Sequence, residues 1–129
     1  MGNKISDYKN ELKVIFGWSV DEENGKPKVP LIIFPDAVAD RIKFFVDQMG
    51  DGLLFTGALN FIFAYDEERD KQDCEEGGEW LPVSDEFKEW RDKHFADNHE
   101  IVVALGMMYG YLPESEAKQK GLPLDMEIK

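Results

Sequence analysis

Cysteine and long apolar runs are scarce in this chain of 129 residues, and each scarcity excludes a class of protein. Cys74 is the only cysteine, so an internal disulfide is excluded and a reducing compartment is expected. The longest stretches without a charged side chain, residues 53–65 and 101–113, have thirteen residues each, and residues 1–10 hold no apolar signal core. Because a helix needs about 20 apolar residues to cross a bilayer, we expect a cytoplasmic protein without a membrane span.

Basic side chains are also few. The chain has 15 Lys and Arg against 27 Asp and Glu, a formal net charge of −12 and a pI near 4.5. Nucleic acids and anionic membranes are bound mainly by Lys and Arg side chains that neutralise phosphates. We therefore expect neither direct nucleic-acid binding nor membrane binding.

Histidine is scarce too, and no catalytic or metal-binding motif is found. His94 and His99 are five residues apart, and no cysteine or third histidine stands near enough to complete a zinc site. A calcium loop that starts at Asp66 or Asp70 lacks the glycine or the carboxylates that such a loop requires. A Gly-rich phosphate loop and a nucleophile elbow are absent. The sequence therefore predicts no enzyme, no metal site and no cofactor.

The most distinctive feature that is present is the acidic stretch DEERDKQDCEEGGE at residues 66–79. It carries eight carboxylates and two cations, which is −6 of the formal charge of −12. So many like charges cannot pack inside a domain, so the segment must lie in water, bind cations or face a positively charged partner. We predict an acidic loop over residues 66–82. The predicted partner-binding residues are Asp66, Glu67, Glu68, Asp70, Asp73, Glu75, Glu76, Glu79 and Trp80.

Trp80 is included because an aromatic side chain beside a polar rim is a common arrangement at binding hot spots. A structural role in the core or at its edge is the alternative for this tryptophan. For the acids, the alternative is a solvated loop that only keeps the protein soluble. A surface on which the acids gather on one face would favour the partner.

The first third of the chain has the pattern of a β-hairpin. Apolar residues occupy every even position from Leu12 to Val20, which predicts a strand over residues 11–20. Asn24-Gly25 favours a hairpin turn, and residues 29–34 supply the returning strand. A helix over residues 7–16 is the competing interpretation.

Helical patterns follow. Pro35 and Asp36 open a helix that Gly50 closes, and a second, apolar nearly all round, starts near Gly52. Ser84 is an N-cap for a helix over residues 85–94, and Asn98 caps another. The buried stripe of the first helix is predicted to contain Val38, Ile42, Phe45, Val46 and Met49.

Residues 113–129 alternate between apolar and polar positions and predict an extended tail. Together these patterns predict one domain over residues 1–129 with an α+β fold. In this fold a small antiparallel sheet, made by the N-terminal hairpin and open to the C-terminal strand, packs against about four helices.

The succession of motifs resembles an uncharacterised family of small accessory proteins of phages and prophages of Gram-positive bacteria. The resemblance covers roughly residues 35–129, and in it Arg41 and Leu112 stand where the family often has Trp and Glu. It implies a phage-encoded protein that acts inside a bacterial host cell, and it supplies no catalytic residues. The motifs that carry it are PDAVADRIKFF, a helix with GAL, VSDEFKEWRDKHFADN, a helix ending in GYLPE, and the alternating tail.

With this resemblance, the acidic segment predicts a protein that binds and inhibits a host protein with a basic surface. The target would be a defence or nucleic-acid-processing protein, inhibited by nucleic-acid mimicry. The first alternative is a self-assembling structural protein in which helices 53–65 and 101–112 pair across a homodimer. A hydrolase that uses Asp and Glu pairs is the second alternative.

Overall fold

The computed structural model describes residues 19–20, 23, 27–28, 31–93, 99–124 and 127–128. The chain divides into two compact units, Met1–Leu31 and Ile32–Lys129. In the first unit β1 (Ser19–Val20) pairs antiparallel with β2 (Pro27–Lys28), so the pairing precedes the predicted return strand over residues 29–34. Residues 11–18 of the predicted strand, the competing helix over residues 7–16 and the Asn24-Gly25 turn lie outside the described residues.

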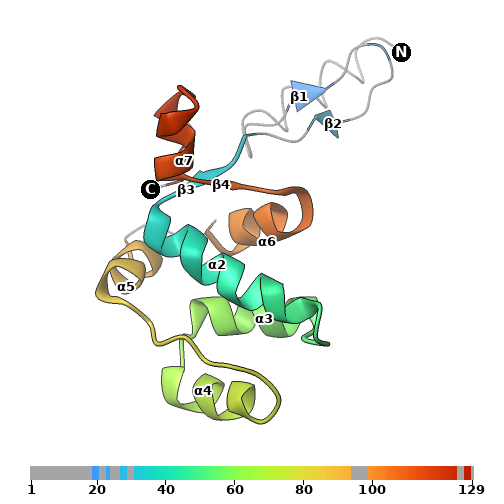
Figure 1. The fold of residues 1–129 in the computed structure, drawn as a ribbon, viewed down its shortest axis with the longest axis vertical. Helices are drawn as coiled ribbons and strands as arrows, with labels where there is room; N and C mark the ends of the chain where they lie inside the picture. Colours follow the sequence, from blue (N-terminus) through green and yellow to red (C-terminus); the bar gives the residue numbers. More distant parts are fainter. Residues whose placement is uncertain are drawn as a thin grey trace. The chain divides into compact units, whose positions relative to one another are not determined.

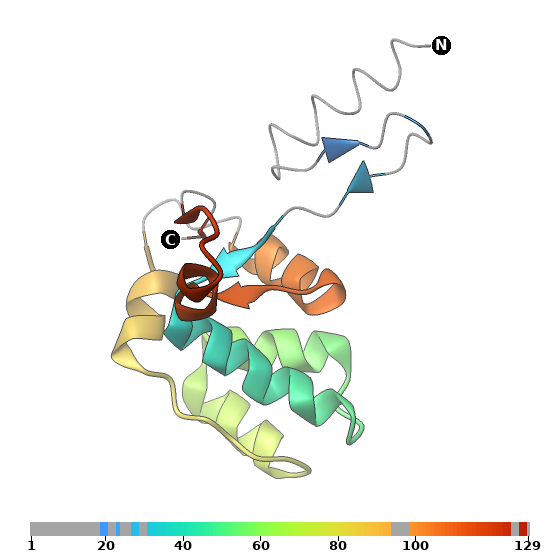
Figure 2. The same cartoon turned by 45° about the horizontal axis from the view of Figure 1, so that its top comes forward.

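The second unit is mostly helical (Figure 1). α2 packs mainly against α3 and also contacts α5 and α6, and α4 lies beyond α3 (Figures 1 and 2). The described helices are α2 (Asp36–Met49), α3 (Phe55–Phe63), α4 (Glu67–Glu75), α5 (Asp85–Arg91), α6 (His99–Tyr109) and α7 (Glu114–Gln119). The strands of this unit are β3 (Ile33–Phe34) and β4 (Leu112–Pro113).

The predicted α+β fold with an antiparallel sheet packed on helices is therefore wrong. β3 and β4 form a parallel pair of two residues each, with Ile33 opposite Leu112 and Phe34 opposite Pro113. Each strand runs directly into a helix whose N-cap is a proline, Pro35 for α2 and Pro113 for α7. Proline has no N–H for a ladder hydrogen bond, so the pairing stops where the helices begin.

The extended tail predicted over residues 113–129 is also interrupted, because α7 forms within it. Two i,i+4 ion pairs, Glu114–Lys118 and Glu116–Lys120, support this helix. Beyond it, Glu127 makes a single parallel bridge to Ile33. The tail thus pairs with β3 in parallel, whereas the sequence predicted an antiparallel sheet.

The helical predictions fare better where a stripe faces the core. α2 begins at Asp36 and ends before Gly50 as predicted, and its residues Val38, Ile42 and Phe45 are fully buried. Ser84 caps α5 as predicted, because its hydroxyl oxygen accepts from the Phe87 backbone N–H at 3.1 Å. α5 ends at Arg91, and residues 94–98 lie outside the described part of the chain. The same core contains Phe34, Ile62, Phe63, Phe87, Trp90 and Val103.

Candidate protein-binding surface

The acidic segment is a helix where the sequence predicted a loop. Asp66 is the N-cap of α4, and its carboxylate accepts from the Arg69 backbone N–H at 3.3 Å. Glu67, Glu68 and Asp70 lie in the first turn, where negative charge is favourable to the helix dipole. Four of the acids are thus placed at the N-terminal end of a helix, which suits them, and a count of charges along the sequence does not reveal this.

Two side chains, one turn apart, fix the inner face of α4. Asp70 is 6% exposed, and its carboxylate accepts from the Asn60 amide nitrogen at 3.0 Å. Cys74 is 5% exposed, and its Sγ donates to the Glu79 carbonyl oxygen at 3.1 Å. Burial, together with the neighbouring Glu75 carboxylate, raises the pKa of the Cys74 thiol. Asp70 therefore anchors the helix and adds no charge to the exposed face.

The loop after α4 is held by a single glutamine from α2. The Gln48 Nε2 donates to the Glu79 carbonyl oxygen at 3.0 Å, and its Oε1 accepts from the Glu79 N–H at 2.9 Å. A Cβ at Gly78 would collide with the Gln48 side chain, so only glycine allows this close approach. The Gly78 N–H also donates to the Cys74 carbonyl oxygen at 2.8 Å. The backbone of the loop at Gly78 and Glu79 is thus held against α2.

A buried arginine secures the next stretch of chain. Arg41 is 2% exposed, and it donates to the carbonyl oxygens of Ile62 at 2.6 Å, Phe61 at 2.8 Å and Leu81 at 2.7 Å. Its guanidinium carbon lies 5.1 to 5.3 Å from the ring centroids of Phe45, Trp80 and Phe87. Burial lowers the pKa of Arg41 to about 10, so the side chain stays charged at neutral pH.

A second arginine, Arg91, binds carbonyl groups at the same C-terminal end of α3. Its Nη1 donates to the carbonyl oxygens of Phe63 at 2.7 Å and Ala64 at 3.0 Å. Together the two arginines satisfy four successive carbonyl groups at the C-terminal end of α3, where the helix dipole is negative. Sequence reasoning missed this arrangement, because the donors lie about 20 and 28 residues from their acceptors.

The other predicted site residues divide into two groups. Glu67 is half-buried, and its carboxylate accepts from the Val83 N–H at 2.9 Å. Trp80 is half-buried too, and its ring packs against Phe45 and Phe61 as part of the core. The structure leaves the remaining predicted residues exposed: Asp66, Glu68, Asp73, Glu75, Glu76 and Glu79.

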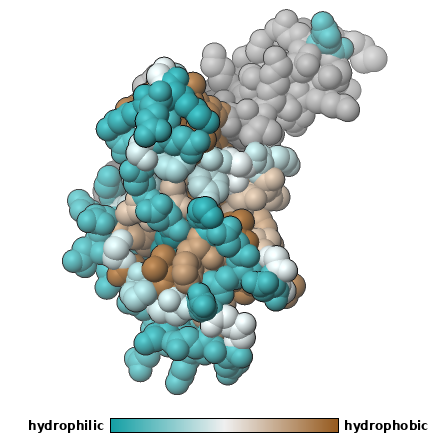
Figure 3. All heavy atoms as spheres, viewed as in Figure 1, coloured by the Kyte–Doolittle hydropathy of each residue, from teal (hydrophilic) through white to brown (hydrophobic). Residues whose placement is uncertain are grey.

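These exposed acids form the surface that we call the acidic face: Asp66, Glu68, Asp73, Glu75, Glu76 and Glu79. The end of the unit formed by α4 is correspondingly hydrophilic (Figure 3). Two cations stand among them, and their ion pairs are long: Arg69–Asp73 at 3.9 Å and Lys71–Glu75 at 3.8 Å. Exposed pairs of this kind contribute little energy, so the face keeps a negative field.

The charge of the whole second unit reinforces this field. Residues 32–129 carry 22 acids and ten bases, whereas residues 1–31 carry five of each, so the entire formal charge of −12 falls on the second unit. Two of its ten bases, Arg41 and Arg91, are used internally on α3. They cannot contact a partner, so the accessible surface is poorer in cations than the sequence count indicates.

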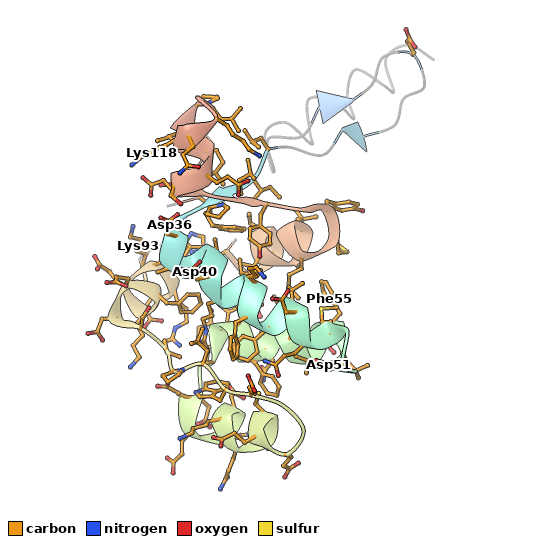
Figure 4. The ribbon with its side chains drawn as sticks, in the orientation of Figure 1. Asp36, Asp40, Asp51, Phe55, Lys93 and Lys118 are labelled. Atoms are coloured by element: carbon orange, nitrogen blue, oxygen red, sulfur yellow. The ribbon has the colours of Figure 1, made fainter. Side chains whose placement is uncertain are left out.

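A groove of about 680 Å³ opens beside the acidic face, between the α2–α3 turn and the C-terminal end of α4. Its acidic lining residues are Asp51, Asp73 and Glu79, and Figure 4 labels Asp51 at the α2–α3 turn. The apolar or weakly polar part of the wall consists of Leu53, Phe61 and Cys74. Gln48, Gly52, Gly77 and Gly78 complete the lining. Sequence reasoning missed Gln48, Asp51 and Leu53, because nothing in their local pattern ties them to the acidic segment about 25 residues later.

Within the described residues, no group of three or more His, Cys, Asp or Glu side chains is arranged to hold a metal ion. In the same part of the chain, every helix is too short or too polar to span a bilayer. No protein-family model, curated protein or solved structure matches the chain.

Proposed function

We propose that this protein binds a basic partner protein through the acidic face and thereby blocks the nucleic-acid site of that partner. The observation that carries the proposal is the presentation of the acids on a helix held from within. Asp70, Cys74 and Gln48 fix α4 and the following loop, so the carboxylates keep their spacing without a partner. Such a preorganised surface loses little entropy on binding.

The spacing of the charges supports mimicry of one nucleic-acid strand. Five exposed acids lie on residues 66–76, namely Asp66, Glu68, Asp73, Glu75 and Glu76. At a rise of 1.5 Å per residue this stretch is about 16 Å long, which is one acid per roughly 3 Å. Phosphates along one DNA strand are about 3.4 Å apart, and both strands together give one charge per about 1.7 Å. The exposed acids alone therefore approach the charge density of a single strand, and with Arg69 and Lys71 counted the exposed side chains of the stretch keep three net negative charges, one per roughly 5 Å.

The resemblance to phage and prophage accessory proteins supports a defence or nucleic-acid-processing protein of a bacterial host as the partner. It also supports the bacterial cytoplasm as the compartment in which the two meet. In this proposal the protein is an inhibitor and not an enzyme, since its acids act by charge and shape alone.

The test compares three proteins in affinity capture from a bacterial lysate. The outer variant carries Glu68→Lys, Glu75→Lys and Glu76→Lys, which leave the groove intact. The control variant carries Glu86→Lys, Glu89→Lys and Glu100→Lys, three exposed acids on α5 and α6. A basic nucleic-acid-binding protein captured by the wild type and the control, but not by the outer variant, supports the proposal. Equal capture by all three proteins contradicts it.

Activity then decides whether binding is inhibition. The purified partner is assayed on its nucleic acid with and without this protein, at about 0.05 and 0.3 M salt. Exposed charges are screened over about 8 Å at 0.15 M, so inhibition should weaken as the salt concentration rises. A partner whose nucleic-acid binding is unaffected at low salt rejects the inhibitor role.

Self-association is a second candidate, because α6 leaves large apolar side chains in water. Ile101, Met108 and Tyr109 on this helix are 47 to 56% exposed, and Leu54 at the start of α3 is 74% exposed. A homodimer would cover such side chains. Light scattering distinguishes the two states, since the monomer has a mass of 14.8 kDa. A monomer at high micromolar concentration rejects this candidate.

A further inference from the structure

We infer that the groove between the α2–α3 turn and the C-terminal end of α4 holds one arginine side chain of the partner. The inference rests on the proposed function, because it names the group by which a basic partner is anchored. It goes further in placing that anchor in a groove that combines two residues of the acidic segment, Asp73 and Glu79, with residues outside it, chiefly Asp51, Leu53 and Phe61.

The charges of the groove select a cation. Its lining residues include the acids Asp51, Asp73 and Glu79 and no Lys, Arg or His. Within the described residues, one ion pair involves these acids, that of Arg69 with Asp73. The Arg69 Nε lies 3.9 Å from the Asp73 carboxylate, and both side chains are more than half exposed. An incoming guanidinium can replace this weak pair with charge-assisted hydrogen bonds, which are shorter and stronger.

The uncharged part of the lining favours arginine over a compact cation. Leu53 and Phe61 can cover the aliphatic stem and the flat face of a guanidinium, which is more weakly hydrated than an ammonium group. The protein already holds its own Arg41 against aromatic rings in this way. Lysine has a strongly hydrated head and no planar face, so it gains less from the same walls.

The size and rigidity of the groove fit a segment of protein. Its volume of about 680 Å³ lies within the range of about 300 to 1,000 Å³ that is usual for ligand sites and exceeds one side chain. Gly52, Gly77 and Gly78 line it without side chains, so the backbone next to the arginine can approach closely. The contacts of Gln48 and Cys74 with Glu79 fix one wall before binding.

The probe is the peptide acetyl-Gly-Gly-Arg-Gly-Gly-amide, added to the full chain labelled with ¹⁵N. We expect saturable shifts of the amide signals of Gly52, Leu53, Gly77 and Gly78. The matched peptide with citrulline, which has the same shape and no charge, should cause no saturable shift, and the lysine peptide should bind several-fold more weakly. Equal binding of the citrulline and arginine peptides overturns the inference, as does saturable binding that shifts only signals elsewhere.

Two variants test the carboxylates. Asp73→Asn with Glu79→Gln keeps the shape of the groove, and circular dichroism checks the fold. We expect arginine-peptide affinity to fall about tenfold or more, as for the loss of hydrogen bonds to a charged group. The control, Glu86→Gln with Glu89→Gln on α5, should leave the affinity unchanged. A groove variant that binds the arginine peptide as well as the wild type overturns the inference.

The two proposals fail separately. If the outer variant loses the captured partner while the arginine peptide does not bind the groove, the acidic face stands and the arginine site is rejected. If the arginine peptide binds the groove but the outer variant still captures every partner, the arginine site stands and the role of the outer acids is rejected.

Discussion

Arg41 shows how one residue decides the packing around α3. No described carboxylate forms an ion pair with its buried guanidinium. The guanidinium instead donates hydrogen bonds to carbonyl oxygens of α3 and of Leu81. A buried charge without a counter-ion is usually costly. Here the nearby Glu67 carboxylate, the negative end of the α3 dipole and three aromatic faces offset that cost.

Replacing Arg41 by Ala should lower the free energy of unfolding by about 3 kcal/mol or more, because several buried carbonyl groups lose their donors. Arg41→Lys should recover only part of this loss, since one ammonium cannot reach three separated oxygens in a plane. Urea unfolding measures both variants. Arg69→Ala is the control, because that side chain is 77% exposed and should change stability by less than about 0.5 kcal/mol. An Arg41→Ala protein as stable as the control variant would show that the buried guanidinium is not needed.

The position of Arg41 in the helical pattern of α2 indicates a buried side chain, although its charge suggests an exposed one. The position falls between Val38, Ile42 and Phe45 on the apolar stripe of α2, where a surface cation is not expected. Its partners cannot be found in the same way, because backbone carbonyl groups leave no trace in the residue pattern. Burial of Arg41 was therefore predictable in principle, but its role at the end of α3 was not.

Cys74 reports on the contact between α4 and its loop. Its thiol is buried and its pKa is raised, so alkylation by iodoacetamide at pH 8 should be slow and limited by local opening. Gly78→Ala should speed the reaction by about tenfold or more, because the new methyl group displaces Gln48 and its paired hydrogen bonds with Glu79. Gly77→Ala is the matched control, since a Cβ there meets no atom within 4 Å. Equal rates for the two variants would contradict the assigned role of Gln48.

At the scale of elements, α2 is the best determined by its sequence. Its apolar stripe, initial proline and final glycine agree with one another, and the structure has the helix where they predict it. Phe45 lies in this stripe and touches Phe44, Phe61 and Trp80. The helix therefore organises both the core and the wall that carries the groove.

Phe45→Ala should cost about 3 to 5 kcal/mol of stability, because it removes a fully buried ring and leaves a cavity. Phe61→Ala should cost less, since that ring is only partly buried and borders the groove. Denaturant unfolding tests both, with Leu54→Ala as the exposed control. A loss below about 1 kcal/mol for Phe45 would contradict the assigned core.

The strands and the acidic segment were harder to predict for physical reasons. Residues 31–34 read LIIF, a continuous apolar run that is typical of a buried parallel strand, yet the nearby turn signal at Asn24-Gly25 favoured a hairpin. In α4 the charge density favoured a loop. The inward pair Asp70 and Cys74, one turn apart, and the i,i+4 pairs with Arg69 and Lys71 were the helical signals that composition concealed.

At the scale of the whole molecule, the net charge acts on stability as well as on binding. Two like charges 10 Å apart in water repel by about 0.4 kcal/mol, and an exposed ion pair contributes about 0.2 to 1 kcal/mol. The second unit has 12 more acids than bases, so repulsive pairs outnumber the few ion pairs. This imbalance was not visible as a property of one unit until the boundary after Leu31 was known.

Stability should therefore rise by about 1 kcal/mol when sodium chloride increases from 0.02 to 0.3 M, because salt screens the repulsion. The outer variant and the control variant both change the formal charge from −12 to −6, so both should show a smaller rise. Urea unfolding at the two salt concentrations measures the effect, and a fall in wild-type stability with salt would mean that ion pairs dominate. Self-repulsion belongs to the whole unit, whereas recognition belongs to the acidic face. The two variants should therefore agree in their salt response and differ in partner capture, and a difference in salt response as large as that in capture would contradict this separation.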